Sequence, residues 1–338
     1  MPALLQVLVA TPAHSRLSGP LVYESEQHLP PGTLVRVPLG SRDTLGLVWP
    51  GEPAAPPLAQ IKPVQEALTD IAALDTHWLE LMAFAAAYYQ RSVGEFALGS
   101  LPPSLRDLSR QQLLRKLDKR AKAAAVIAPH NPDALLPELT AEQSQVLQQL
   151  ATGSGTFLLH GNTGSGKTEV YLRRAAQVMA MDPQAQVMML VPEINLTPQL
   201  EERVRQRFAA LGDHAIVSMH SGMTPAQRLN SWLSAHTGQA RLVLGTRLAV
   251  LASVPHLKLI VVDEEHDPSY KQQEGARYSA RDLAVYRGRL QSAQVILGSA
   301  TPSLESWHHS RAPVDGQDTP RYVRLSMPSR IGQGSLPQ

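Results

Sequence analysis

The sequence predicts an α/β protein in which a parallel sheet covered by helices follows a small β-rich domain. Strands and helices alternate from Leu139 onward, a pattern typical of parallel sheets. A glycine-rich loop at residues 161–168 lies between an apolar strand and a helical periodicity. The first hundred residues instead carry short strand-like runs separated by turns.

Composition limits the class of protein and its compartment. With 338 residues and 43% hydrophobic content, the chain is long enough for two domains with cores. No apolar run approaches the roughly 18 residues of a membrane span, and residues 1–4 lack a basic segment and a cleavage site. The chain has no cysteine, so it forms no disulfide. These features predict a cytoplasmic protein without membrane contact; the net charge of +2 does not by itself indicate nucleic acid.

The first domain is predicted to span residues 1–105. A helix is expected over residues 75–89, with Thr76 as its N-cap. Strand character is found in four runs, at residues 4–9, 33–40, 44–49 and 61–64.

Residues 106–137 are predicted to form a basic helix and a linker. Two interpretations of the helix stay open: a solvated linker helix, or an arm that contacts the phosphates of nucleic acid. Residues 129–137, with three prolines, complete the linker. The basic side chains are those of Arg106, Arg110, Arg115, Lys116, Lys119, Arg120 and Lys122.

The second domain is predicted over residues 138–330, followed by a tail at 331–338. Its apolar runs have the length of buried strands, as expected for a sheet covered on both faces. The six strands are expected near residues 156–160, 186–191, 215–219, 241–245, 258–263 and 294–298.

The loop at 161–168 fits the pattern G-x-x-x-x-G-K-[ST] in the strand-loop-helix context that defines a P-loop. Backbone N–H groups and the helix N-terminus are expected to cradle phosphates. Lys167 would reach the β and γ phosphates of ATP, and Thr168 would hold Mg²⁺ through its hydroxyl. The predicted nucleotide-binding residues of the loop are Gly161, Asn162, Thr163, Gly164, Ser165, Gly166, Lys167 and Thr168.

A cluster of acids follows the apolar run at 258–262. Asp263, at the end of this strand, is expected to hold Mg²⁺. Glu264 is placed to orient or deprotonate the water that attacks ATP, so Lys167 and Glu264 are the predicted catalytic residues.

The run Asp263-Glu264-Glu265-His266, together with residues 298–303, resembles motifs II and III of superfamily-two helicases. The resemblance implies that the second domain is the first RecA-like lobe of such an enzyme. It further implies that Gln143, upstream of the P-loop, reads adenine, and that His266 and Thr301 couple the γ-phosphate to the DNA-binding face.

Residues 191–199, 220–223, 245–247 and 267–278 resemble, more narrowly, the family of primosomal replication-restart DNA helicases. This resemblance implies an ATP-dependent 3′-to-5′ helicase that acts on stalled forks with other primosome proteins and single-strand-binding protein. Single-stranded DNA would cross the carboxyl ends of the strands. The residues expected to contact it are Thr246, Arg247, Lys271 and Arg277, with Tyr270 and Tyr278 stacking on bases.

The amino-terminal part resembles that family's domain for the 3′ end of a nascent strand, at residues 36–40, 46–48 and 87–89. An aromatic-acid-aromatic run of the family's pocket corresponds here to Leu21-Val22-Tyr23, in which only the tyrosine fits. End recognition is therefore expected to depend on Gly40 and Lys62.

The family continues into a second lobe and a zinc module with paired cysteines, neither of which is expected in this sequence. An arginine from the facing lobe contributes about 10³–10⁵ in rate to phosphoryl transfer. We therefore expect a chain that binds ATP, Mg²⁺ and DNA but hydrolyses and unwinds poorly. Two alternatives stay open: a fork-binding module without motor activity, and a lobe of another superfamily-two translocase that acts on DNA or RNA.

Overall fold

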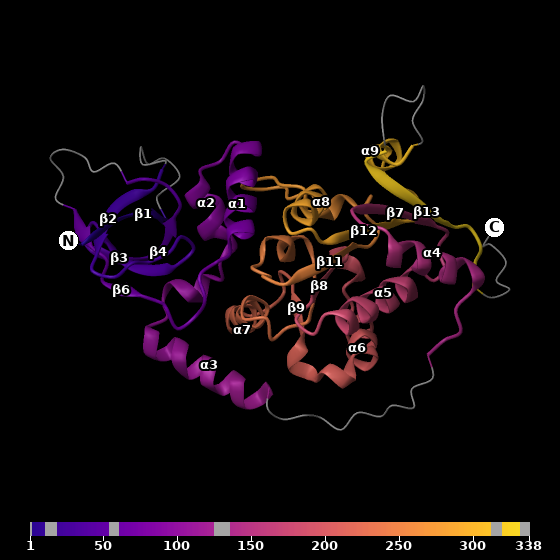
Figure 1. The fold of residues 1–338 in the computed structure, drawn as a ribbon, viewed down its shortest axis with the longest axis horizontal. Helices are drawn as coiled ribbons and strands as arrows, with labels where there is room; N and C mark the ends of the chain where they lie inside the picture. The colour runs from indigo at the N-terminus through magenta and orange to yellow at the C-terminus, as the bar shows by residue number, and fades with distance from the viewer. Residues whose placement is uncertain (1, 11–18, 54–60, 125–135, 312–319, 332–338) are drawn as a thin grey trace.

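The computed structural model describes residues 2–10, 19–53, 61–124, 136–311 and 320–331. Within these ranges the chain forms two sheets, with helices α1 (Thr76–Tyr88) and α2 (Val93–Ser100) between them (Figure 1). The predicted linker residues 129–135 and the tail residues 332–338 lie outside the described part. None of the helices within the described ranges combines the length and apolarity that a membrane crossing needs.

The first sheet has six strands in the order β5-β2-β1-β4-β3-β6. Its neighbours are antiparallel except for the parallel pair β2 and β5. The four predicted strands are confirmed, whereas β2 and β6 were not predicted. The bounds are β1 (Ala3–Val9), β2 (Leu21–Ser25), β3 (Leu34–Leu39), β4 (Arg42–Trp49), β5 (Lys62–Pro63) and β6 (Glu66–Ala67).

Helix α1 lies where the sequence places it, but its predicted cap is wrong. Asp75, in extended backbone, is the N-cap and accepts a hydrogen bond from the Trp78 backbone N–H at 2.9 Å. Thr76 is instead the first helical residue. Helix α2, capped by Ser92, was not predicted, since its eight residues are too few to show a helical period.

The basic helix α3 (Arg110–Ala124) begins four residues later than predicted, because Pro103–Arg106 forms the 3₁₀ turn η1. The helix is not fully solvated. Leu113 is buried, Arg110 pairs with Asp70, and Arg120 donates to Gln239 Oε1 at 2.7 Å. These contacts anchor α3 to both domains.

The second sheet has seven parallel strands in the order β13-β7-β12-β11-β8-β10-β9. All six predicted strands are confirmed. The seventh, β13 (Tyr322–Met327), was missed, because it is an edge strand with alternating exposure rather than an apolar run. The others are β7 (Thr156–Gly161), β8 (Gln186–Leu190), β9 (Ile216–Met219), β10 (Leu242–Gly245), β11 (Leu257–Val262) and β12 (Gln294–Ser299).

Helices cover both faces of this sheet. Successive residues of a strand belong to different apolar clusters: Val187 and Met189 pack with α4, α5 and α6, whereas Met188 and Leu190 pack with α7 and α8. This alternation explains why the strands are apolar throughout. The helices are α4 (Ala141–Thr152), α5 (Lys167–Met181), α6 (Pro198–Arg207), α7 (Pro225–His236) and α8 (Ala280–Leu290); the short α9 (Leu304–His309) follows β12.

The apolar cluster on the α7 and α8 face continues into the first domain through α1. The buried Trp78 indole donates to the Leu251 carbonyl at 2.8 Å. The rings of Phe84 and Tyr286 stack with centroids 3.5 Å apart. The two predicted domains therefore share one core rather than meeting across a loose linker.

Candidate nucleotide site and the adjoining strand ends

The P-loop connects β7 to α5 with a backbone that requires glycine. Gly164 and Gly166 both have φ of +83°, and Gly166 is the N-cap of α5. A Cβ built at Gly164 meets no atom within 4 Å, whereas one at Gly166 would clash with Gln143 and Ile331. The loop therefore has free space beside Gly164, whereas Gly166 packs closely against Gln143 and Ile331.

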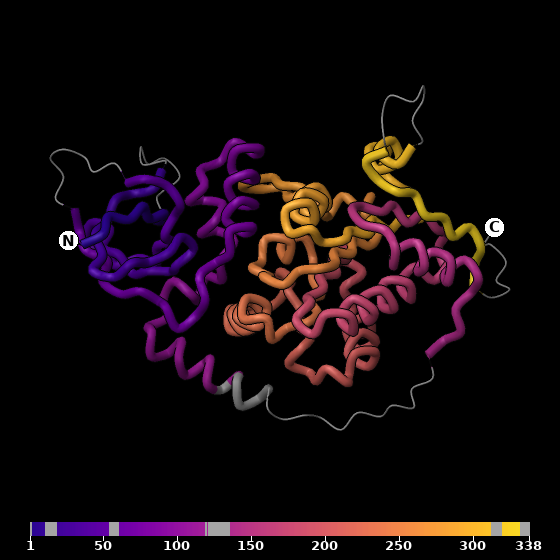
Figure 2. Tube along the Cα trace, viewed as in Figure 1, coloured from indigo at the N-terminus to yellow at the C-terminus, as the bar shows by residue number. Residues whose placement is uncertain are grey.

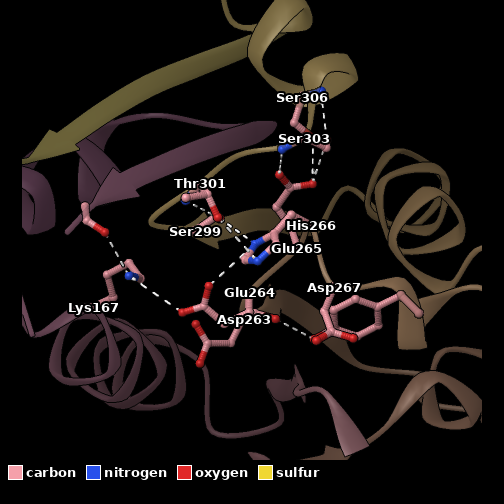
Figure 3. A network of polar contacts seen from close by, with 12 residues as sticks. Lys167, Asp263, Glu264, Glu265, His266, Asp267, Ser299, Thr301, Ser303 and Ser306 are labelled. Atoms are coloured by element: carbon pink, nitrogen blue, oxygen red, sulfur yellow. Dashed lines mark hydrogen bonds and ion pairs between the residues drawn. The ribbon is translucent and has the colours of Figure 1, made fainter. Parts of the chain in front are cut away.

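The side chains of the loop fit the phosphates of a nucleotide. Ser165 Oγ is buried and has no hydrogen-bond partner among the described residues. Lys167 Nζ donates to the Gly161 carbonyl at 2.9 Å and lies 3.8 Å from Glu264 Oε1 (Figure 3). The open glycine turn and the helix N-terminus, with Lys167 beside them, form the kind of donor set that an anion binds.

Gln143 contacts the P-loop at Gly166. It is buried, its Oε1 accepts from the Thr140 backbone N–H at 2.9 Å, and its Nε2 donates to the Gly166 carbonyl at 3.3 Å. Gln143 thus completes a capping box on α4 and holds the last glycine of the loop, two roles that were not predicted from the sequence. That it reads adenine stays a prediction.

The segment after β13 also contacts the P-loop. The Ile331 backbone N–H donates to the Gly164 carbonyl at 3.0 Å, and Ser329 Oγ donates to Glu142 at 2.7 Å. Figure 2 shows this yellow segment running beside α4. The contacts were not predictable, because they join residues more than 160 positions apart.

Asp263 follows β11, and the pKa of its carboxyl group is raised. Burial, followed by the neighbouring charge of Glu264, raises its pKa from 3.8 to about 6. The Tyr171 hydroxyl donates to Asp263 Oδ1 at 3.1 Å and opposes this shift. Gly298 makes room for that hydroxyl, since a Cβ there would overlap it.

The protein oxygens available to Mg²⁺ are few. Across the described ranges, no group of three or more His, Cys, Asp or Glu side chains is placed to hold a metal ion. Mg²⁺ is typically held by one or two protein oxygens together with substrate phosphates. Thr168, in the first turn of α5, and Asp263, after β11, stay the predicted pair of protein ligands.

The predicted coupling residues lie in one polar network (Figure 3). His266 Nδ1 is 2.7 Å from Ser299 Oγ and 3.6 Å from Glu264 Oε2, and His266 Nε2 is 3.4 Å from Thr301 Oγ1. Ser299 also accepts from the Thr301 backbone N–H at 2.9 Å. The network connects Lys167, through Glu264, with the turn after β12. Ser299 was not predicted.

Glu265, the second acid of the motif, was also missed as a site residue. Its side chain is fully buried and joins motif II to the start of α9. Oε1 accepts from the Ser303 backbone N–H at 2.7 Å. Oε2 accepts from Ser306 Oγ at 2.9 Å and from Arg281 Nη1 at 3.3 Å.

The tyrosines expected to stack on bases are buried. Tyr270 is 3% exposed, and its hydroxyl lies 2.6 Å from the Asp263 carbonyl oxygen and 3.0 Å from that of Leu190. Tyr278 is 7% exposed, and burial raises its pKa to about 12. The prediction of surface stacking platforms is therefore wrong for this structure: Tyr270 instead connects the loop to the strand that carries Asp263.

The remaining predicted DNA contacts lie on loops at the carboxyl ends of β10 and β11. Arg247 Nε donates to Gln272 Oε1 at 2.7 Å, and Thr246 is buried. Lys271 and Arg277 are exposed, and Lys271 Nζ lies 5.4 Å from the centre of the Tyr89 ring. This edge therefore presents cations near a residue of the first domain.

The predicted end-binding residues of the first sheet lie close together. Lys62 Nζ donates to the Gly40 carbonyl at 3.4 Å, and Lys62 pairs with Tyr23 between β5 and β2. The Tyr23 hydroxyl donates to the Pro38 carbonyl at 3.0 Å, and burial raises the pKa of Tyr23. Gly40 has φ of +63° and open space where a Cβ would lie.

Comparison with known proteins shows the class to which this protein belongs. Residues 140–309, half of the chain, match the DEAD/DEAH box helicase family, and the chain belongs to that family. Residues 6–102 match the 3′DNA-binding domain (3′BD) of PriA. Both matches agree with the two sheets and the placement of the motifs.

The particular relatives are replication restart proteins. Replication restart protein PriA of Synechocystis is 35% identical over 88% of this chain and 36% of its own length. PriA of Treponema pallidum is 32% identical over 91% of this chain and 44% of its own length. The chain thus spans less than half of these relatives. Among solved structures, that of the DUF1998 helicase MrfA bound to DNA is 19% identical over 64% of this chain and 28% of that chain, with a TM-score of 0.44.

Proposed function

We propose that the chain forms the nucleotide-binding lobe and the 3′-end-binding domain of an ATP-dependent DNA helicase of replication restart. The observation that carries the proposal is the polar network from Lys167 through Glu264 and His266 to Thr301. It lies in a lobe that shares its core with a domain of the 3′-end-binding type. A direction of movement from 3′ to 5′ follows from the likeness to PriA.

Each part of the nucleotide site has a proposed role. ATP with Mg²⁺ supplies the γ-phosphoryl group and the charge that stabilises its transfer. Residues 164–167 would hold the phosphates, with Lys167 leaving the Gly161 carbonyl to do so. Thr168 and Asp263 would hold the metal ion, and Glu264 would orient the attacking water. Gln143 would keep the loop in place and face the adenine side.

The polar network connects the nucleotide site with the edge of the sheet that we propose faces DNA. Lys167 lies near one carboxylate oxygen of Glu264 and His266 near the other. Withdrawal of Lys167 toward phosphate would leave His266 as the remaining partner of Glu264 within this network and shift the turn that carries Thr301. We therefore propose that His266 and Thr301 couple nucleotide binding to DNA affinity.

DNA would meet the chain at two places. Gly40 and Lys62 would receive the 3′ end of a nascent strand, and the loops carrying Thr246, Arg247, Lys271 and Arg277 would hold single-stranded DNA. The partners proposed by likeness to PriA are other primosome proteins and single-strand-binding protein, in the cytoplasm.

The test compares nucleotide and DNA binding in matched lysine variants. Lys167→Ala should weaken binding of a fluorescent ATP analogue with Mg²⁺ by at least about 10-fold, because a charge-assisted phosphate contact is lost. Lys258→Ala, which removes an exposed lysine at the start of β11, should leave binding unchanged. Nucleotide should alter DNA affinity in the unmodified chain and not in Lys167→Ala. If nucleotide leaves DNA affinity unchanged in the unmodified chain, the protein is a fork-binding module without motor coupling.

A further inference from the structure

A buried tyrosine of α5 lies beside a predicted metal ligand and has no role in the site as proposed above. Tyr171 is 1% exposed, and its ring belongs to the apolar cluster that also contains Leu159, Val261 and Ile296. Close packing of this kind leaves a ring little freedom to turn. The hydroxyl at the end of the ring therefore has a fixed position.

The spacing along α5 places Tyr171 on the side of the helix that carries the last residues of the P-loop. Residues three and four positions apart are neighbours on the surface of a helix. Thr168 precedes Tyr171 by three positions and Lys167 precedes it by four, and all three lie in α5. One helix thus supplies the lysine proposed to hold phosphate, the threonine proposed to hold Mg²⁺ and the tyrosine hydroxyl.

The Tyr171 hydroxyl reaches from α5 to the end of β11, where it donates to Asp263 Oδ1 at 3.1 Å. The backbone of Asp263 is held separately. Its N–H donates to the Leu190 carbonyl at 2.9 Å, and its carbonyl accepts from the Tyr270 hydroxyl at 2.6 Å. Among the described residues, Tyr171 is the only one that donates a hydrogen bond to the Asp263 carboxylate. The direction of this carboxylate therefore depends on Tyr171.

The second oxygen of the Asp263 carboxylate stays available. Within the described ranges no group donates to Asp263 Oδ2, and this oxygen is not one of the five buried side-chain atoms that lack a partner. Oδ2 therefore keeps contact with solvent, as a ligand of a metal ion requires. Carboxylates that bind metal ions are usually held by hydrogen bonds from neighbouring groups, and loss of such a neighbour typically costs about 10-fold to 100-fold in metal affinity.

Gly298, in β12, provides the space for the Tyr171 hydroxyl. A Cβ built at Gly298 lies 1.6 Å from the hydroxyl oxygen and 2.7 Å from the ring carbon that bears it. Any larger residue at this position would displace the hydroxyl, and with it the hydrogen bond to Asp263. The Gly298 carbonyl also accepts from the Glu265 backbone N–H at 3.0 Å. The same residue thus contacts both motif II and the tyrosine that holds it.

We propose that Tyr171 is a positioning residue for Mg²⁺ binding: its hydroxyl directs the Asp263 carboxylate so that Oδ2 is the oxygen offered to the ion. The inference rests on the proposed function, which assigns Thr168 and Asp263 to the metal ion. Tyr171 contacts neither the ion nor the nucleotide, since its side chain is buried and its hydroxyl donates to Asp263. Loss of the hydroxyl should therefore weaken only the part of nucleotide binding that depends on Mg²⁺.

The experiment measures the affinity of a fluorescent ATP analogue twice, with excess Mg²⁺ and with EDTA, at one salt concentration and one pH. The ratio of the two affinities reports how much the metal ion contributes to nucleotide binding. Tyr171→Phe keeps the ring and removes only the hydroxyl. It should lower this ratio about 10-fold, because an outer hydrogen bond to a metal ligand is lost. Its affinity for the analogue in EDTA should be unchanged.

Two further variants separate positioning from a general loss of packing. Gly298→Ala, in which the added Cβ displaces the Tyr171 hydroxyl, should lower the ratio by a similar factor. Its combination with Tyr171→Phe should add little, because the hydroxyl is then already absent. Tyr89→Phe is the matched control. The Tyr89 hydroxyl accepts from the Ser279 backbone N–H at 3.0 Å, between the end of α1 and the start of α8, and its removal should leave the ratio unchanged.

Two results would overturn the inference while leaving the proposed function standing. One is an unchanged ratio in Tyr171→Phe. The other is an equal loss of affinity with Mg²⁺ and with EDTA, which would show a general effect on the fold or on the P-loop. An unmodified chain that binds the analogue equally well with Mg²⁺ and with EDTA would contradict the proposed function itself, because Thr168 and Asp263 would then not hold a metal ion with the nucleotide.

Discussion

Replacing Glu265 by alanine tests whether motif II is held by a buried acid. The Glu265 side chain has no solvent exposure, and its two oxygens accept hydrogen bonds from Ser303, Ser306 and Arg281. Glu265→Ala leaves these donors without their acceptor. The start of α9 then loses its side-chain hydrogen bonds to motif II.

The magnitude follows from the contacts. Each buried donor left unpaired costs about 1–3 kcal/mol, and breaking a buried charged pair typically costs about 3–5 kcal/mol. Arg281 retains Asp282 as a partner at 2.9 Å, which reduces its share of the loss. We therefore expect Glu265→Ala to lower the free energy of unfolding by about 3–4 kcal/mol.

Urea unfolding followed by circular dichroism measures this loss. Glu305→Ala is the matched control, because Glu305 lies 3.9 Å from the same Arg281 but is 69% exposed. Its loss should stay below about 0.5 kcal/mol, as for other surface pairs. The reasoning is refuted if the two variants unfold within about 0.5 kcal/mol of each other.

Three further substitutions test the surroundings of Asp263. Since the folded state raises the pKa of Asp263 from 3.8 to about 6, the ionised form opposes folding above that pH. Asp263→Asn should therefore stabilise the nucleotide-free chain by about 1–3 kcal/mol at pH 8, a gain that fades toward pH 4; an equal gain at both pH values in urea unfolding contradicts this. Gly298→Ala places a Cβ against the Tyr171 hydroxyl and should lower stability by about 1–3 kcal/mol, with partial recovery when Tyr171→Phe is added; thermal unfolding without that recovery would disprove the clash. Tyr270→Phe removes the hydroxyl beside the Asp263 carbonyl and should cost about 1–2 kcal/mol in urea unfolding, whereas no change would show that the contact contributes little.

The site was predictable from the sequence where its function depends on residues at fixed spacing within a short segment. The P-loop requires glycines at fixed spacing before Lys167, and Asp263 follows an apolar strand, so both were predictable from short runs. The parallel sheet was predictable for a related reason. Strands such as β8 are buried on both faces and are apolar at every position but the first, Gln186.

The parts that escaped prediction depend on contacts between distant residues. Ser299 becomes part of the site only because β12 lies beside β11, which brings it to His266. Acidic residues such as Glu265 usually lie at the surface, yet the Glu265 side chain is fully buried against the start of α9. Tyr270 lies in a loop of polar composition, so the sequence gives no sign that its ring is buried in the apolar cluster that includes Leu190 and Val262. Such contacts are set by the fold and leave no local pattern.

We propose that a 3′-end-binding domain and a nucleotide-binding lobe act in one chain. Fluorescence anisotropy at a stated salt concentration should compare a fork whose 3′ end is free at the junction with the same fork whose end is blocked. We expect tighter binding to the free end, and we expect Lys62→Ala to reduce this preference because it removes the cation beside Gly40. Equal affinity for the two forks in the unmodified chain would contradict it.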